Sequence, residues 1–290
     1  MNRIIIALLG ALCAGGIAAT RDAGHLERSR IEDPLLALGG AISSMALMRA
    51  GGVAPILAAT ATGLIGGLSV RWIKGARDYH GAPIYAGAFV GITSALVLPS
   101  FWWVLLAGVV TGFIWSLSRD AWVGIGGKMG TMALISTFAV SLVARSVHQR
   151  GPGAHPLEAH SILLAAFLVG GVAAPVTHYL SHQRGWGAVL GSSVPTAAFS
   201  LVMALLPASS LPHGNVLSYL WYGSSFVGMT TPERVARSFW AIALTGLLFT
   251  WLALRFGPVL SGMGGTAGVV ALVSVFTMRG IQSLSRLKRT

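Results

Sequence analysis

The sequence predicts an all-α polytopic membrane protein built by internal duplication of a five-segment unit. Of the 290 residues, 54% are hydrophobic and only 10% are charged, whereas globular chains carry roughly 25% charged residues. The 20 basic residues outnumber the 8 acidic ones and lie between apolar runs, as in the cytoplasmic loops of membrane proteins. The two halves of the chain also share an ordered set of motifs. Together these features exclude an ordinary globular domain, a disordered chain and a nucleic-acid-binding module.

Apolar segments near the length of a membrane span fill most of the chain, since a helical span needs about 20 apolar residues. In the first half they lie at 35–50, 53–70, 83–98, 101–118 and 121–144. In the second half they lie at 161–181, 185–206, 216–231, 235–254 and 258–278. The sequence therefore predicts about ten spans.

The remaining segments complete the domain organisation. The N-terminal apolar segment, 1–20, is either a signal peptide or an uncleaved first span, and we favour the span. The other predicted units are a polar connector 21–34, repeat 1 at 35–145, a linker 146–160, repeat 2 at 161–279 and a basic tail 280–290. The single cysteine, Cys13, excludes an intrachain disulfide.

The duplication is visible in the order of the motifs. Residues 85–94 read Tyr-Ala-Gly-Ala-Phe-Val-Gly-Ile-Thr-Ser, and residues 222–231 read Tyr-Gly-Ser-Ser-Phe-Val-Gly-Met-Thr-Thr. A Phe-Trp pair follows in each half. A Gly-x-Gly-Gly-x-x-Gly motif comes next, at 124–130 and again at 262–268. Because the order is kept with one inserted residue, we interpret the halves as copies of one unit.

Two arrangements of the copies fit the charges. Five full spans per half make the repeats inverted, whereas re-entrant segments at 83–98 and 216–231 leave four spans and make the repeats parallel. Both place the basic tail in the cytoplasm and give the same balance of basic residues between the two faces. We favour inverted repeats in the inner membrane, with the C-terminus in the cytoplasm. The third segment of each half is where we expect any break within a helix.

The matched segments supply the candidate residues of a substrate path. Glycines that interrupt helices near the middle of a membrane protein, at the interface of two repeats, are typical of transport sites. The candidates are Phe89, Gly91, Thr93, Gly126, Gly127, Lys128, Phe226, Gly228, Thr230, Gly264, Gly265 and Thr266.

Each candidate also has a simpler explanation. Gly91 and Gly228 can serve helix packing, and Thr93 and Thr230 can bond to their own helices. Lys128 would attract anions if it lies inside a span. Alternatively, it lies near the membrane face and extends to water.

No catalytic or metal-binding constellation is recognisable. The sequence lacks a Ser-His-Asp set and paired carboxylates within a span, and His178 and His182 lack a third ligand nearby. We therefore expect no enzyme, no metal and no cofactor. None of the acidic residues falls inside a predicted span, which argues against strong cation coupling.

These observations predict transport of a small neutral or anionic solute, as a channel-like facilitator or a secondary carrier. The alternative is a non-transporting subunit or assembly factor of a larger membrane complex. The expected partners are the lipid bilayer and the solute or anion, without nucleic acid. The sequence leaves open whether copies associate into a homo-oligomer.

Overall fold

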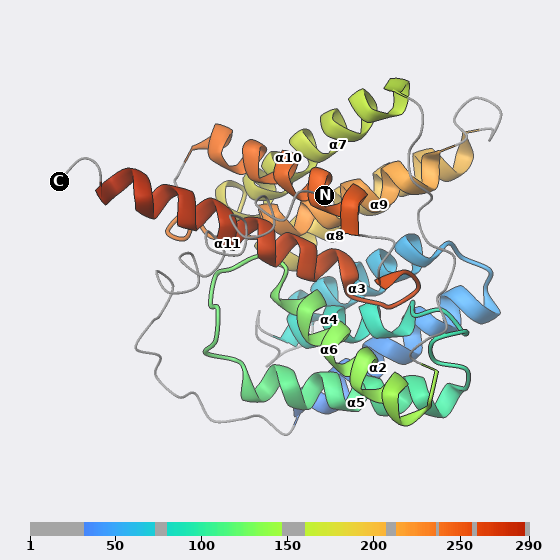
Figure 1. Cartoon of the computed structure of the whole chain (residues 1–290). Coiled ribbons are helices and arrows are strands. Elements are labelled where there is room, and N and C mark those ends of the chain that lie inside the picture. Colours follow the sequence, from blue (N-terminus) through green and yellow to red (C-terminus); the bar gives the residue numbers. More distant parts are fainter. Residues whose placement is uncertain are drawn as a thin grey trace.

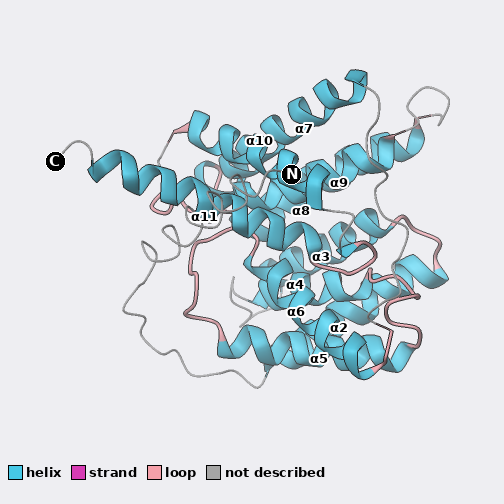
Figure 2. Ribbon diagram, in the orientation of Figure 1, coloured by secondary structure: helices cyan, strands magenta, loops and turns pink. Residues whose placement is uncertain are grey.

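The structure, a computed structural model, contains only helices among the residues that it describes. These residues are 32–72, 80–146, 160–206, 213–235, 238–256 and 260–287. No strand occurs within these ranges (Figure 2), which confirms the all-α class. The predicted N-terminal segment 1–20, most of the connector 21–34 and most of the linker 146–160 lie outside the described residues.

Ten α-helices account for the described fold. The first five, with a π-helical turn after the first, are α2 (Glu32–Met45), η1 (Ala46–Ala50), α3 (Pro55–Trp72), α4 (Gly81–Gly91), α5 (Phe101–Leu117) and α6 (Lys128–Val143). The other five, again with a π-helical turn after the first, are α7 (His160–His178), η3 (Tyr179–Gln183), α8 (Gly187–Leu205), α9 (Gly214–Gly228), α10 (Phe239–Phe256) and α11 (Thr266–Leu287).

The helices differ from the predicted segments mainly where glycine interrupts the apolar runs. α4 ends at Gly91, so the predicted segment 83–98 is helical only in its first part. α6 and α11 begin at Lys128 and Thr266, several residues later than predicted, because Gly127 and Gly265 adopt a left-handed backbone just before them. α11 then continues through 287, so the first part of the basic tail is helical.

Several of these helices suit a membrane. Four are long and apolar enough to cross one: Ile162–Gln183, Gly187–Leu205, Phe239–Phe256 and Thr266–Ser285. Two more, Phe101–Leu117 and Lys128–Val143, are apolar but shorter. This composition is compatible with a membrane protein, in agreement with the class that the sequence predicts.

Two short helices, α4 and α9, lie at the centre of the fold. α4 packs against α2, α3, α5 and α6, and α9 packs against α7, α8, α10 and α11. α3 against α8 and α6 against α11 connect the two groups. In Figure 1 the helices up to α6 occupy the lower part of the view, and α7 and α10 lie at the top.

Small residues allow α2 and α4 to approach closely. A Cβ on Gly40 would overlap the backbone carbonyl of Ile84, and a Cβ on Gly87 would overlap that of Ala37. At the far end of the contact, the hydroxyl of Ser44 donates a hydrogen bond to the carbonyl of Ala88 over 2.8 Å. Close backbone contact through small residues is the usual way in which helices pack inside membranes.

We expect Gly40→Ala and Gly39→Ala to have opposite effects on stability. Gly40→Ala forces α2 away from α4 and should cost about 1–3 kcal/mol through overpacking. The neighbouring Gly39 has open space where its Cβ would lie, so Gly39→Ala should be neutral or gain up to about 1 kcal/mol of helix propensity. Thermal denaturation of the purified variants in detergent measures both. Equal midpoints for the two variants would contradict the contact.

Candidate functional site

The two central helices meet through four aromatic side chains. Tyr85 and Phe89 lie one turn apart on α4, and Tyr222 and Phe226 lie one turn apart on α9. The ring centroids of Phe89 and Phe226 are 5.1 Å apart, and each Phe also contacts the Tyr of the other helix, at 5.7 and 6.2 Å. All four side chains are buried, at distances typical of attractive ring contacts. We call this group the aromatic cluster.

The chain after α4 is fixed by the loop that precedes α11. The hydroxyl of Thr93 accepts a hydrogen bond from the backbone N–H of Gly264 over 3.1 Å. Next to it, the N–H of Ser94 donates to the carbonyl of Gly262 over 2.8 Å. Thr93 and Gly264 are buried, so the bond between them satisfies polar groups that have little access to water.

The chain after α9 is fixed in the same way by the loop that precedes α6. The hydroxyl of Thr230 accepts from the N–H of Gly126 over 3.0 Å. The N–H of Thr231 donates to the carbonyl of Gly124 over 2.9 Å. Each central helix therefore ends against a glycine loop from the opposite half of the chain. The carbonyl end of α4 lies beside the amino end of α11, and the carbonyl end of α9 lies beside the amino end of α6, which is the favourable order of helix dipoles.

Only glycine fits at these contacts. A Cβ on Gly126 would overlap the carbonyl of Phe226, and a Cβ on Gly264 would overlap the carbonyl of Phe89. The next residue in each loop, Gly127 or Gly265, has a φ of +86° or +90°. Any other residue would be strained there. The glycine motifs thus serve close backbone approach and a sharp start of α6 and α11.

Gly91 and Gly228 are packing residues at the ends of the central helices. A Cβ on Gly91 would overlap the hydroxyl oxygen of Ser44 on α2. A Cβ on Gly228 would overlap the carbonyl of Ala174 on α7 and lie 2.7 Å from Cβ of Thr177. Both glycines therefore fit the simpler explanation, while Thr93 and Thr230 bond to opposite loops rather than to their own helices.

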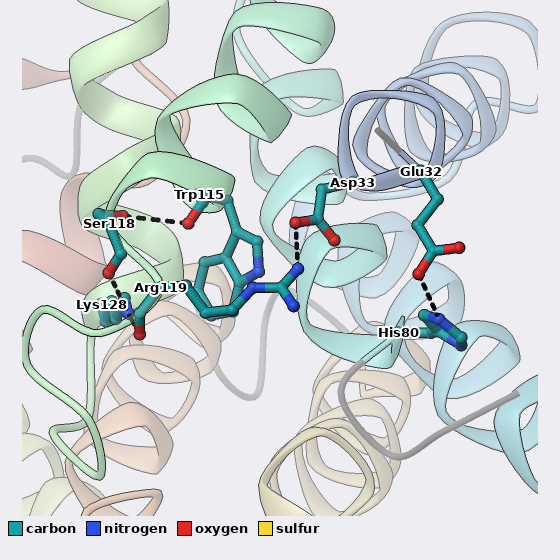
Figure 3. Close-up of polar contacts among 7 residues, drawn as sticks. All are labelled: Glu32, Asp33, His80, Trp115, Ser118, Arg119 and Lys128. Carbon is teal, nitrogen blue, oxygen red and sulfur yellow. Dashed lines mark hydrogen bonds and ion pairs between the residues drawn. The ribbon is translucent and has the colours of Figure 1, made fainter. Parts of the chain in front are cut away.

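Lys128 and Thr266, the first residues of α6 and α11, bind the loops beside them. The ammonium of Lys128 donates to the carbonyls of Ser118 and Arg119, over 2.7 and 2.8 Å, and lies 4.8 Å from the ring centroid of Trp115 (Figure 3). It thereby caps the carbonyl end of α5. The hydroxyl of Thr266 donates to the carbonyl of Met263 over 2.8 Å. Both side chains are largely buried.

One carboxylate is buried, although the sequence indicated none. Asp33, in the first turn of α2, is completely inaccessible and forms an ion pair with Arg119 (Figure 3). The preceding residue, Glu32, pairs with His80 over 3.0 Å. The sequence predicts Asp33 within the polar connector 21–34, although a Glu-Asp-Pro start of an apolar run is typical of a helix N-terminus and is the signal for its place in α2. Its ion pair with Arg119 connects α2 to the turn that follows α5.

Arg49 and the histidine pair of His178 and His182 are two further polar groups. Arg49, in the η1 turn, donates from Nη2 to the carbonyl of Leu98 over 3.0 Å and so holds the loop after α4. The rings of His178 and His182 lie 4.7 Å apart. Among the described residues, no group of three or more His, Cys, Asp or Glu side chains could hold a metal ion.

Comparison of the chain with protein-family models, curated proteins and solved structures gives no match. The candidate site consists of the aromatic cluster between α4 and α9 and of the two helix ends, at Thr93 and Thr230, that meet the glycine loops.

We expect Thr93→Val and Thr230→Val each to destabilise the protein by about 1–3 kcal/mol. Each removes the acceptor of a buried N–H and leaves that group unsatisfied. Thr111→Val is the matched control, because the hydroxyl of Thr111 bonds only within its own helix, to Ala107. Thermal denaturation of the three variants in detergent measures the effect. A loss for Thr111→Val as large as for the other two would refute a special role of the helix ends.

Proposed function

We propose that the protein spans the membrane ten times as two inverted repeats, and that it transports a small neutral or anionic solute along their interface. The observation that carries the proposal is the pair of helix ends in the protein interior, at Gly91 and Gly228, each facing a glycine loop from the other half. Interrupted helices inside a membrane protein are tolerated where they are buried in protein or line a path, and transporters use them for substrate.

The proposed duplication is supported by the order and the contacts of the helices. α2 to α6 and α7 to α11 follow one another with the same neighbours, and a π-helical turn comes after the first helix of each set. The bonds from Gly264 to Thr93 and from Gly126 to Thr230 are reciprocal, as a twofold axis between copies requires. Inverted copies require that all five segments of each set cross the membrane, including α4 and α9 together with the residues that follow them.

The aromatic cluster is the proposed constriction of the path. Phe89 and Phe226 are 1% exposed, so this conformation is closed at the centre. Opening requires the rings to move apart, which suits a small solute and a gated facilitator or a carrier. The ammonium of Lys128 is engaged with the end of α5, and this favours a neutral solute over an anion.

We expect Phe89→Ala and Phe226→Ala to increase the flux of small solutes several-fold, because each removes a ring from the constriction. Phe249→Ala is the control: its side chain is equally buried, on α10, and it lies outside the aromatic cluster. Stopped-flow light scattering of proteoliposomes exposed to urea, glycerol, chloride or formate measures the flux. No flux above that of empty liposomes, for the native protein and both variants, would favour the alternative of a non-transporting subunit in a larger complex.

We expect Lys128→Met to lower the thermal denaturation midpoint, because it removes the cap of α5, and Lys128→Arg to retain much of the stability. The ratio of formate flux to urea flux should be the same in both variants and in the native protein. A lower ratio in Lys128→Met at unchanged stability would instead assign Lys128 to the path.

A further inference from the structure

We infer that a row of buried hydroxyls beside the aromatic cluster binds a small neutral solute that both donates and accepts hydrogen bonds, such as a polyol or an amide. The inference rests on the proposed function and deepens it, since it names the class of solute and the side chains that select it. The row consists of Ser192, Thr196 and Ser200 on α8, with Tyr85 of α4 and Ser225 of α9 at its first member. We call these five side chains the hydroxyl row.

The hydroxyl row begins at the aromatic cluster. The hydroxyl oxygens of Ser192 and Ser225 share a hydrogen bond of 2.7 Å, and Ser225 directly precedes Phe226. The hydroxyl of Tyr85, whose ring belongs to the aromatic cluster, lies near that of Ser192. A solute that passes between the rings of Phe89 and Phe226 would therefore meet these hydroxyls next.

From there the row follows the interface of α8 and α9. Ser192, Thr196 and Ser200 are spaced four residues apart, so they lie on one face of α8. All three are buried. The ring of Phe199 stacks on that of Trp221 from α9, with centroids 4.5 Å apart, and α8 packs along α9. The row thus leads away from the aromatic cluster inside the protein.

Several hydroxyls of the row have no partner. A buried Ser or Thr in a helix ordinarily donates to a carbonyl about one turn earlier, as Ser193 does to Val189. By contrast, the hydroxyls of Tyr85, Thr196 and Ser200 form no hydrogen bond of normal geometry within the part of the chain that the structure describes. Buried polar groups nearly always have a partner, so these are the groups that a bound molecule would satisfy.

The surroundings of the row suit a neutral molecule and not an ion. α4, α8 and α9 contain no Lys, Arg, Asp, Glu or His within their bounds. A charge removed from water is far more costly than a neutral polar group unless a countercharge pairs with it. A hydroxyl both donates and accepts hydrogen bonds, so a solute with both kinds of group matches the row, whereas an anion would use only its donors.

The first half of the chain has no corresponding row. The π-helical turns 46–50 and 179–183 match at an offset of 133. At this offset the three hydroxyls of α8 correspond to small residues of α3 without a hydroxyl, Ala59, Gly63 and Gly67. Under the proposed duplication, the packing of the repeat therefore does not require the hydroxyls, and their polarity is a property of the second half alone.

The first test is solute flux through the full chain in proteoliposomes, measured by stopped-flow light scattering with glycerol, urea and formate. Ser192→Ala and Thr196→Val each remove one hydroxyl of the row. We expect each to lower the glycerol and urea fluxes roughly three- to ten-fold, the effect of one hydrogen bond, at a thermal denaturation midpoint close to that of the native protein. Ser193→Ala is the matched control and should leave both fluxes unchanged, because its hydroxyl is equally buried but bonds within its own helix.

Tyr85→Phe is a further variant that retains the ring and its packing, so it keeps the test valid if a change in α8 prevents folding. Its glycerol and urea fluxes should fall by a similar factor. Binding is measured independently of flux by saturation-transfer NMR of glycerol with the purified protein in detergent. The native protein and Ser193→Ala should transfer saturation to glycerol equally, and Thr196→Val and Tyr85→Phe several-fold less.

Several outcomes would overturn the inference. They are equal fluxes and equal saturation transfer in the native protein and all variants, a formate flux above those of glycerol and urea in the native protein, and hydroxyl variants that change water permeability alone. The last would assign only water to the row. The expected pattern of saturation transfer without flux in the native protein would refute transport but not the row. Flux in the native protein without that pattern would refute the row but not transport.

Discussion

The arrangement of the whole molecule depends on two helices that end inside it. The last carbonyls of any helix lack partners within that helix, and at Gly91 and Gly228 the surroundings are buried. The N–H groups of Thr93 and Thr230 donate to the helix carbonyls of Val90 and Val227. The hydroxyls of the same two threonines accept from the N–H groups of Gly264 and Gly126 in the glycine loops. Because each loop comes from the other half of the chain, the two sets of helices are held in one relative position by directional bonds, not by apolar contact alone.

This constraint explains the distribution of glycine. Gly126 and Gly264 stand where even one methyl group would overlap a carbonyl, and Gly130 and Gly268 stand where α6 crosses α11. At that crossing a Cβ on Gly130 would lie 2.7 Å from Cα of Gly268. In packing of this kind the backbones of two helices touch directly, in place of contacts between large side chains. Such contacts suit a membrane, because lipid provides little hydrophobic driving force for helices to associate.

Much of the fold could be predicted from the sequence, because apolar runs of this length have few alternatives to helices. The breaks before Lys128 and Thr266 follow from the weak helix propensity of glycine. Their positions are set by the left-handed backbone of Gly127 and Gly265, which the structure shows and the sequence does not. Burial of Asp33 could not be predicted, since its partner Arg119 is distant in sequence and pairing across α2 and α5 is a property of the packed helices. The different surroundings of Gly39 and Gly40 could not be predicted for the same reason, because a glycine in open space and one against a backbone carbonyl look alike in the sequence.

The reciprocal loops also bear on how such a chain could have arisen. Neither set of helices is complete alone, because the N–H of Gly264 donates to Thr93 and the N–H of Gly126 donates to Thr230, each in the opposite set. If one ancestral gene encoded a single set, its product reached a finished core only by pairing with an identical molecule. Under the proposed duplication, fusion of two such genes would join the partners of a homodimer covalently and so raise the effective concentration of each half at an interface that was already specific.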